Sequence, residues 1–280
     1  MAHATPCPWK TETHELTPEK EVLAMTCQWN PQLVSPALLD LTLTLGVREK
    51  DFVILAEGNT SELIDDDRIV VKASGARMGS VTAKDFVVSE VSSLVDLMDS
   101  PDATQQDLIE ALDAGTHDGV RRRGSIETLI HVAVQSLRPT RFVGHTHPTP
   151  LVSLLASVHQ ETAFDTFVYS DEAIVIGTTL YVPYAQPGID LGRVYLRALR
   201  EYFAEHNDLP SLVLLGNHGI VALAETAEGV EAITEMAYKG AQVRLQALAA
   251  GGAKPLSAEA VRSYFEREDM AERRRNLSGV

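Results

Sequence analysis

The segment RFVGHTHP at residues 141–148 reads as a short strand that carries two histidines and stops at a proline. Side chains alternate between the two faces of a strand, so His145 and His147 project from the same face and can bind one metal ion together. Pro148 lacks a backbone donor and ends the pairing, which leaves both imidazoles at the end of a sheet. Chance H-x-H pairs are common, so a packed or solvated role stays open for this pair alone.

The segments around this strand alternate between helical and extended patterns. SIETLIHVAVQSL, residues 125–137, places its apolar residues with a helical period behind Ser125 as N-cap, and LVSLLASV, residues 151–158, predicts a second short helix. Further helices are expected at 34–46, 188–206, 226–250 and 257–275, and a mixed connector at 101–124. Strands or β-rich stretches are expected at 52–61, 68–75, 86–98, 173–177, 179–184, 211–217 and 219–224.

Helices and strands interleave without a linker or an internal repeat, which favours one α/β domain with helices covering a central sheet. Residues 1–33 are polar and rich in proline, and we interpret them as a loosely attached arm. The main domain is expected at 34–250, and residues 251–280 should add a C-terminal helix to it.

Composition narrows the range of partners. The chain has 280 residues and a formal net charge of −15, which disfavours a general nucleic-acid or anionic-membrane binder. The two cysteines, Cys7 and Cys27, could form only one disulfide bond, too few to stabilise a chain of this length, so we expect a reducing, cytoplasmic setting. There is no 18-residue apolar run, so no membrane span is expected.

A third histidine, His218, lies in LVLLGNHGIVAL between two apolar runs that look like buried strands. A tight turn there needs glycine or asparagine, but it does not need a histidine. Three histidines leave one coordination position open, as in catalytic zinc sites. A structural turn histidine is the alternative.

One carboxylate and three small-residue segments complete the candidate chemistry. Glu127 stands in the first turn of the 125–137 helix, where compensation of the helix dipole is the simpler role. GNTS (58–61), KASG (72–75) and GSIE (124–127) suit an anion, and Lys72 would supply a full charge. Taken singly, such segments are usually ordinary turns.

In this order and spacing, the motifs resemble the class II aldolase/adducin family, over about residues 34–250. The H-x-H pair, His218 and Glu127 are similar to the residues of the fuculose-phosphate aldolase type. Lys72 is similar instead to the pentulose-phosphate 4-epimerase branch, which usually carries aspartate at the position of Glu127. The S-I-E-T-L-I-H string also resembles the aldolase half of rhamnulose-phosphate aldolase/dehydrogenase fusions. Ile126 departs from the family's second serine and removes one expected phosphate hydroxyl.

The resemblance implies a three-layer α/β/α sandwich around a mostly antiparallel sheet, and a homotetramer with its active site near a subunit boundary. It implies Zn²⁺, or another divalent metal, on His145, His147 and His218, with Glu127 beside the metal as the base. Tyr169 stands at the interval of the family's catalytic tyrosine, and a half-buried strand tyrosine is the alternative. The implied substrate and phosphate pocket comprises Asn59, Thr60, Lys72, Ser74, Gly75 and Ser125.

The function expected from this resemblance is cleavage of a phosphorylated ketose through an enediolate that the metal stabilises. An epimerase, dehydratase or decarboxylase acting on a related sugar would use the same site, so these reactions stay open. A non-catalytic, adducin-like scaffold is the alternative outside enzymes. The partner is expected to be a small sugar or sugar phosphate rather than nucleic acid or a membrane.

Overall fold

The computed structural model describes residues 26–270 and 272–273. In this part of the chain an eight-stranded sheet runs in the order β1-β4-β3-β2-β7-β10-β9-β8. Neighbouring strands are antiparallel except β8 and β9, which are parallel. The strands are β1 (Cys27–Gln28), β2 (Asn59–Leu63), β3 (Arg68–Lys72), β4 (Phe86–Glu90), β7 (Phe142–Thr146), β8 (Thr179–Val182), β9 (Leu212–Leu215) and β10 (Gly219–Ala224).

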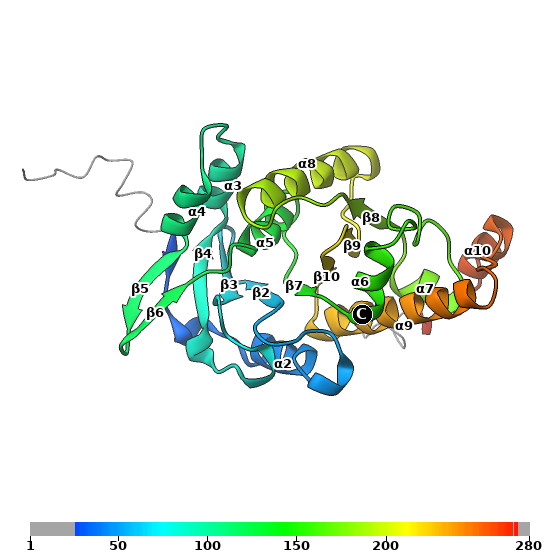
Figure 1. Ribbon diagram of the computed structural model, residues 1–280, viewed down its shortest axis with the longest axis horizontal. Coiled ribbons are helices and arrows are strands. Elements are labelled where there is room, and N and C mark those ends of the chain that lie inside the picture. Colours follow the sequence, from blue (N-terminus) through cyan, green and yellow to red (C-terminus); the bar gives the residue numbers. More distant parts are fainter. Residues whose placement is uncertain (1–25, 271, 274–280) are drawn as a thin grey trace, which may run out of the picture.

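Helices cover both faces of this sheet, which gives the three-layer α/β/α arrangement (Figure 1). One face carries α3 (Val91–Asp99), α5 (Thr128–Gln135) and α8 (Ile189–His206); the other carries α2 (Pro36–Leu45), α6 (Thr149–Leu155) and α9 (Ala227–Ala249). The remaining elements are α4 (Gln105–Ala111), α7 (Ser170–Val175), α10 (Ala258–Phe265) and a separate hairpin of β5 (Asp113–His117) and β6 (Val120–Arg123). The predicted fold class is confirmed.

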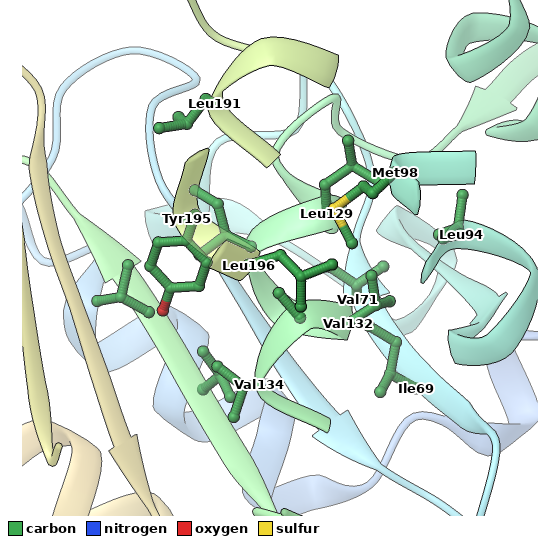
Figure 2. Close-up of a cluster of buried hydrophobic side chains, with 14 of the residues drawn as sticks. Ile69, Val71, Leu94, Met98, Leu129, Val132, Val134, Leu191, Tyr195 and Leu196 are labelled. Atoms are coloured by element: carbon green, nitrogen blue, oxygen red, sulfur yellow. The ribbon is translucent and has the colours of Figure 1, made fainter. Parts of the chain in front are cut away.

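β3, β9 and β10 are mostly apolar because both faces of the sheet are buried there, whereas β2 (NTSEL) buries polar residues. Figure 2 shows the face under α3, α5 and α8, where Ile69 and Val71 of β3 lie beneath Leu129 and Val132 of α5. Tyr195 of α8 is fully buried in this layer, and its hydroxyl has no partner among the described residues. The layer fixes α5 on the sheet, and Glu127 immediately precedes this helix.

Several predicted elements are wrong; local backbone geometry explains one of them, and a tertiary contact explains another. Residues 52–58 are not a strand, because Leu55 (φ 53°) and Gly58 (φ 66°) turn the chain before β2 begins at Asn59. Residues 173–177 were expected to be a strand, but most of them form α7. That helix buries Glu172 against Arg244 of α9, a tertiary contact that overrides the β propensity of its apolar residues.

The other differences concern where elements end. The β-rich stretch at 86–98 is a strand only to Glu90, where α3 follows, and the 101–124 connector contains α4 and the β5–β6 hairpin. The C-terminal helix predicted at 257–275 ends at Phe265. Residues 1–25 of the predicted arm lie outside the described residues, but Cys27 is buried and pairs with β4, so loose attachment is wrong there.

The helices in the described ranges include none that is both long and apolar enough to cross a membrane.

Candidate metal centre and adjoining pocket

Three neighbouring strands and the start of α5 bring the four predicted metal ligands together. His145 lies in β7, opposite Asn59 of β2 and Val221 of β10, so it stands in the middle of the sheet. One ligand atom from each of Glu127, His145, His147 and His218 lies within 4.8 Å of all the others. The three histidines follow Glu127 by up to 91 positions in sequence, yet all four side chains meet at one point in space.

The two histidines of the H-x-H pair face each other through their Nε2 atoms. Nδ1–H of His145 donates to the Ile220 carbonyl at 2.8 Å, which leaves the Nε2 lone pair free to point into the cluster. Nε2 of His147 lies 3.0 Å from Nε2 of His145. Two imidazole nitrogens at this distance need a shared proton or a cation between them. Metal–N bonds of about 2.0–2.1 Å in a tetrahedron would set neighbouring nitrogens about 3.3 Å apart, so the spacing is compatible with a bound divalent ion.

His218 reaches the cluster from a turn that tolerates few alternatives. Asn217 has φ 52°, in the left-handed region, and a Cβ on Gly219 would lie 2.4 Å from the Thr146 carbonyl oxygen. The turn aims Nε2 of His218 at Oε1 of Glu127, 3.0 Å away. Its Nδ1 is buried and has no partner within the described residues. The sequence thus uses glycine to let β10 approach β7, and the histidine is free to serve as a ligand.

The charges inside this cluster depend on one another. Burial raises the pKa of Glu127, but His145 and His218 beside it outweigh burial and hold that pKa well below its usual range. Burial lowers the pKa of His145, and the Glu127 carboxylate more than reverses this. Burial, together with His145 and His218, lowers the pKa of His147 to about 3. An ionised carboxylate among imidazoles, at least one of them neutral, is a ligand set that suits a divalent cation such as Zn²⁺.

A chain of polar side chains contacts Glu127; the sequence analysis named Asn59 for the phosphate pocket but missed His131 and the link from Ser61 to Glu127. Asn59 Nδ2 donates to Glu127 Oε2 at 2.9 Å, and Asn59 Oδ1 contacts His131 Nε2. His131 Nδ1 lies 2.7 Å from Ser61 Oγ. The spacing of these residues could have predicted the contacts. Asn59 and Ser61 are two positions apart on a strand, and Glu127 and His131 are four apart at a helix start, so each pair shares a face.

Glu57 was also missed. Its Oε1 lies 3.7 Å from His147 Nδ1, and its side chain lines two cavities that meet at His147. One cavity, of 430 Å³, also contains Asp51, Thr149 and His218. No spacing rule points to Glu57, because it stands in the irregular loop before β2.

The other cavity, of 390 Å³, holds most of the predicted anion-binding residues: Asn59, Lys72, Ser74, Gly75 and Ser125 line it, together with Glu127 and His147. Backbone contacts bring its two loops together. Ala73 forms an isolated antiparallel bridge with Gly124, and the Ser74 N–H donates to the Arg123 carbonyl at 3.0 Å. The KASG turn and the start of α5 are therefore joined beside the metal cluster.

Lys72 is the cation of this pocket and is 1% exposed. Its Nζ donates to the Ala76 carbonyl at 2.6 Å, which ties the lysine to its own turn. Burial lowers the pKa of Lys72 to about 8, although the negative charges of Glu127 and Asp85 act in the opposite direction. A buried ammonium with few partners favours an anion nearby.

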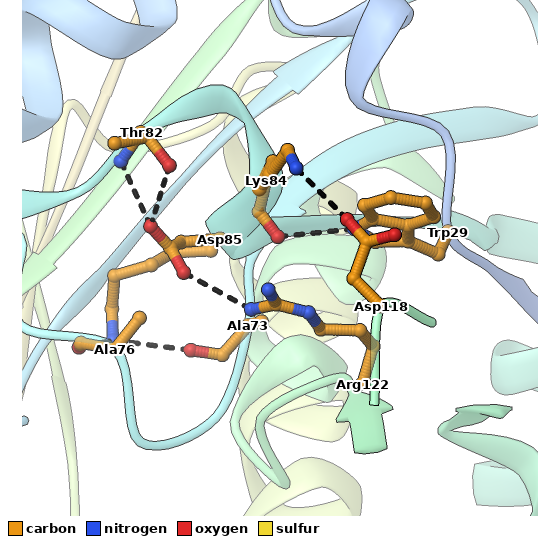
Figure 3. A network of polar contacts seen from close by, with 9 residues as sticks. Trp29, Ala73, Ala76, Thr82, Lys84, Asp85, Asp118 and Arg122 are labelled. Atoms are coloured by element: carbon orange, nitrogen blue, oxygen red, sulfur yellow. Dashed lines mark hydrogen bonds and ion pairs between the residues drawn. The ribbon is translucent and has the colours of Figure 1, made fainter. Parts of the chain in front are cut away.

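A polar network at residues 82–85 supports the pocket from outside (Figure 3). Asp85 Oδ2 accepts from the Thr82 N–H and hydroxyl at 2.9 Å each, and its Oδ1 accepts from Arg122 of β6 at 3.0 Å. Lys84 reaches Asp118 of the hairpin at 2.8 Å, and its carbonyl accepts from the Trp29 indole. The β5–β6 hairpin is thereby held against the loop that carries Ser74 and Gly75.

The structure does not bring Thr60 and Tyr169 to this site. The Thr60 hydroxyl lies 2.5 Å from the Thr42 hydroxyl of α2, on the opposite face of the sheet from Asn59. Tyr169 donates to the sulfur of Met236, and Lys239 lies 5.3 Å from its ring centroid. Burial, with Glu172 and Asp171, raises the pKa of Tyr169 to about 12. Within one chain, neither side chain contacts the candidate ligands.

Solved structures share this fold at low sequence identity. YgbL from Klebsiella pneumoniae superposes with a TM-score of 0.60 at 20% identity, covering 84% of this chain and 99% of that one. An L-fuculose 1-phosphate aldolase gives 0.59 at 18%, covering 83% and 96%. The N-terminal class II aldolase domain of a Thermoplasma acidophilum protein gives 0.58 at 18%, covering 75% and 92%. No curated protein sequence matches this chain.

Residues 41–245, most of the chain, match the family model described as the class II aldolase and adducin N-terminal domain. This range contains the four candidate metal ligands and the lysine of the adjoining pocket. Class II aldolases use a divalent metal, and the cluster of Glu127 and the three histidines suits such an ion. The chain therefore belongs to the class II aldolase and adducin family.

Proposed function

We propose that this chain is a divalent-metal aldolase that cleaves a phosphorylated ketose. One observation carries the proposal: a carboxylate and three imidazoles converge within 4.8 Å beside a pocket that contains a buried lysine. A scaffold without catalysis needs no such set of ligands. The spacing of the imidazoles and the ionised carboxylate supports Zn²⁺ or a similar divalent ion as the cofactor.

Each ligand has a proposed role. His145, His147 and His218 would hold the ion, and Glu127 would lie against it. When bound, the ion supplies a Lewis acid that stabilises negative charge on the carbonyl oxygen of the substrate. Glu127 acts as the base at the carbon next to that carbonyl, because its carboxylate stays ionised and Asn59 holds one of its oxygens.

The neighbouring pocket would take the phosphate of the substrate. Lys72 supplies a full charge in a place that excludes most water, and the hydroxyls of Ser74 and Ser125 line the same cavity. Asn59 and Gly75 complete this proposed set. Ile126 offers no hydroxyl, which argues for a carboxylate or a neutral sugar end instead. Because the full charge of Lys72 outweighs the one missing hydroxyl, we place phosphate first and include both alternatives in the test.

Assembly and the general acid belong together in this proposal. We propose a cytoplasmic homotetramer in which the active site lies near a subunit boundary. Tyr169 would then protonate the departing group only in the site of a neighbouring copy, because in its own chain the hydroxyl is directed at Met236. Light scattering at working concentration should give four chains per particle, and a monomer would contradict this part of the proposal.

An epimerase is the second candidate, and Lys72 favours it, since the KASG segment is similar to the lysine motif of the pentulose-phosphate 4-epimerases. YgbL likewise carries three candidate activities in its name: aldolase, epimerase and decarboxylase. These reactions, and a dehydration, begin with charge on the same carbonyl oxygen. They differ in which bond breaks next.

The test is a panel of phosphorylated and free ketoses and sugar acids, incubated with the Zn²⁺-loaded protein and followed by product identification. Release of an aldehyde and a three-carbon ketone phosphate is the expected result. Recovery of an epimer, or loss of water or carbon dioxide, would assign the second candidate reactions. Absence of any turnover, together with absence of bound metal, would overturn the enzyme proposal.

A further inference from the structure

We infer that Ser61, His131 and Asn59 form a positioning relay that fixes the Glu127 carboxylate. The inference rests on the proposed role of Glu127 as the base. None of the three relay residues is a candidate metal ligand. His131 and Ser61 are fully buried, and Asn59 is 1% exposed. Polar groups this deeply buried need partners, and these groups find them in one another.

The direction of every hydrogen bond follows from one charge. An ionised carboxylate accepts only, so the group of Asn59 that faces Glu127 Oε2 at 2.9 Å must be its NH₂. The amide oxygen of Asn59 therefore faces His131 Nε2, and this nitrogen must carry the proton. A neutral imidazole then has a bare Nδ1, so the Ser61 hydroxyl donates to it over 2.7 Å.

The imidazole of His131 suits this role because it stays neutral. Burial, followed by the nearby charge of His145, lowers the pKa of His131 to about 3. One tautomer then donates on one side and accepts on the other. The relay crosses from β2 to α5 and back, since Asn59 and Ser61 share one face of the strand while Glu127 and His131 lie one helical turn apart.

The relay would fix which way the two carboxylate oxygens of Glu127 point. Asn59 holds Oε2 of Glu127, whereas Oε1 faces His218 at 3.0 Å. If the Asn59 amide turned over, its oxygen would face Oε2 and repel it. His131 prevents that rotation by donating to the amide oxygen. Asn59 also lines the anion pocket, so the same amide connects the pocket with the base.

The activity test compares His131→Phe with His131→Gln in the Zn²⁺-loaded protein. Phenylalanine fills the space but removes both hydrogen bonds. Residues that orient such groups typically contribute about 10–100-fold, so His131→Phe should lower kcat for proton exchange by about that factor, with KM and metal content unchanged. Glutamine can still donate to Asn59, so His131→Gln should restore most of the rate. Ser61→Ala should lower kcat by only about 5-fold, as expected for one neutral hydrogen bond.

A second measurement does not depend on substrate. Nitrogen NMR of histidine-labelled protein, with the His131 signal assigned from its absence in His131→Gln, should show a neutral ring protonated on Nε2. A ring protonated on Nδ1, or equal kcat in wild type and His131→Phe, would overturn the relay. An inactive wild type that nevertheless shows the Nε2 tautomer would instead overturn the proposed reaction and leave the relay standing.

Discussion

The metal centre and the anion pocket are neighbours built in different ways. The metal centre stands on paired strands: His145 lies in the middle of β7, with β2 on one side and β10 on the other, and it is fully buried. The anion pocket stands on loops, and Ser74 and Gly75 are exposed. Its two loops meet through the backbone bridge between Ala73 and Gly124, which includes the hydrogen bond from the Ser74 N–H to the Arg123 carbonyl.

The difference indicates which property each region controls. Paired strands fix side chains by register, so the metal centre should tolerate little change and govern whether any reaction occurs. Loops held by a few surface contacts can shift or be replaced, so the anion pocket should govern which substrate is taken. Mutations in the two regions should therefore separate into loss of metal or rate and loss of anion affinity.

The largest effect is expected from His147→Ala. Removing one of three imidazoles should abolish stable Zn²⁺ binding, so the metal content should fall from about one ion per chain to near zero. Elemental analysis after dialysis measures this directly. His159→Ala is the matched control, because His159 is exposed and lies outside the cluster. Equal metal content in His147→Ala and wild type would show that His147 is not a metal ligand, and the contrast between a metal centre and an anion pocket would fail.

Glu127→Gln should separate rate from metal binding. Glutamine keeps the shape but cannot accept a proton at the substrate carbon, so solvent-deuterium exchange should fall by about 10²–10⁴-fold. The three histidines remain, and most of the metal should be retained. Glu161→Gln, at an exposed position, serves as the control. Exchange at the wild-type rate would reduce Glu127 to a residue that compensates the helix dipole.

Lys72→Met should affect the anion and spare the metal. A charge-assisted hydrogen bond contributes roughly 1.5–3 kcal/mol, so inhibition by inorganic phosphate should weaken by about 10- to 150-fold. Competition by phosphate, measured alongside metal content, tests this. Loss of metal in Lys72→Met would show that the two regions are coupled, contrary to the comparison. Phosphate that leaves wild type and variant equally active would exclude a phosphate site.

The pH dependence sharpens the same test. The pKa of Lys72 is lowered from 10.5 to about 8, so wild-type phosphate affinity should fall as the pH rises through about 8, where the lysine loses its charge. The folded state binds fewer protons at Lys72 than the unfolded state between about pH 8 and 10.5, so this residue makes stability rise with pH in that window. Lys72→Met should lack both trends in phosphate titrations and in urea unfolding.

The smallest effect is expected from Asp85→Asn. Asp85 holds Arg122 and Thr82 outside the pocket, so its loss should loosen the KASG loop and weaken phosphate binding by about 2- to 12-fold, the range of one net hydrogen bond. Metal content should not change. Asp65→Asn removes an exposed ion pair with Arg68 far from the pocket and is the control. Equal effects of the two variants would mean that the network does not support the pocket.

Period and spacing predicted most of the strands and helices because they are local properties, whereas the family resemblance implied the three layers and the mostly antiparallel sheet. His145 and His147 share a face by alternation alone, the turn between two apolar runs pointed to His218, and the resemblance implied the place of Glu127 beside them. The same alternation contradicts the prediction for Thr60. It lies between Asn59 and Ser61 on the strand, so its side chain must point to the other face, toward Thr42. The relay through His131 could have been found from two spacings.

Other features could not be read from the chain. AIVIG at 173–177 has strand propensity, yet most of it lies in α7, whose Glu172 is buried against Arg244 of α9, a contact that no local pattern predicts. Tyr169 matched an interval, yet an interval does not give a direction, and its hydroxyl contacts Met236. Glu57 comes close to His147 through a loop in which Leu55 takes a left-handed conformation, a geometry that no periodicity encodes.

The register between β2 and β7 makes the chemistry of this protein sensitive to chain length. Asn59 is paired with His145, and a strand shifted by one residue turns every side chain to the opposite face. One residue inserted into β7 before His145 would direct both imidazoles toward the α2 and α9 layer, away from Glu127. The same insertion between Gly75 and Met78 would lengthen a surface loop and alter only the reach of the anion pocket. Insertions and deletions should therefore be excluded from β7, where they would destroy the metal centre. They should be tolerated in the loop between Gly75 and Met78, where they would change only substrate selection.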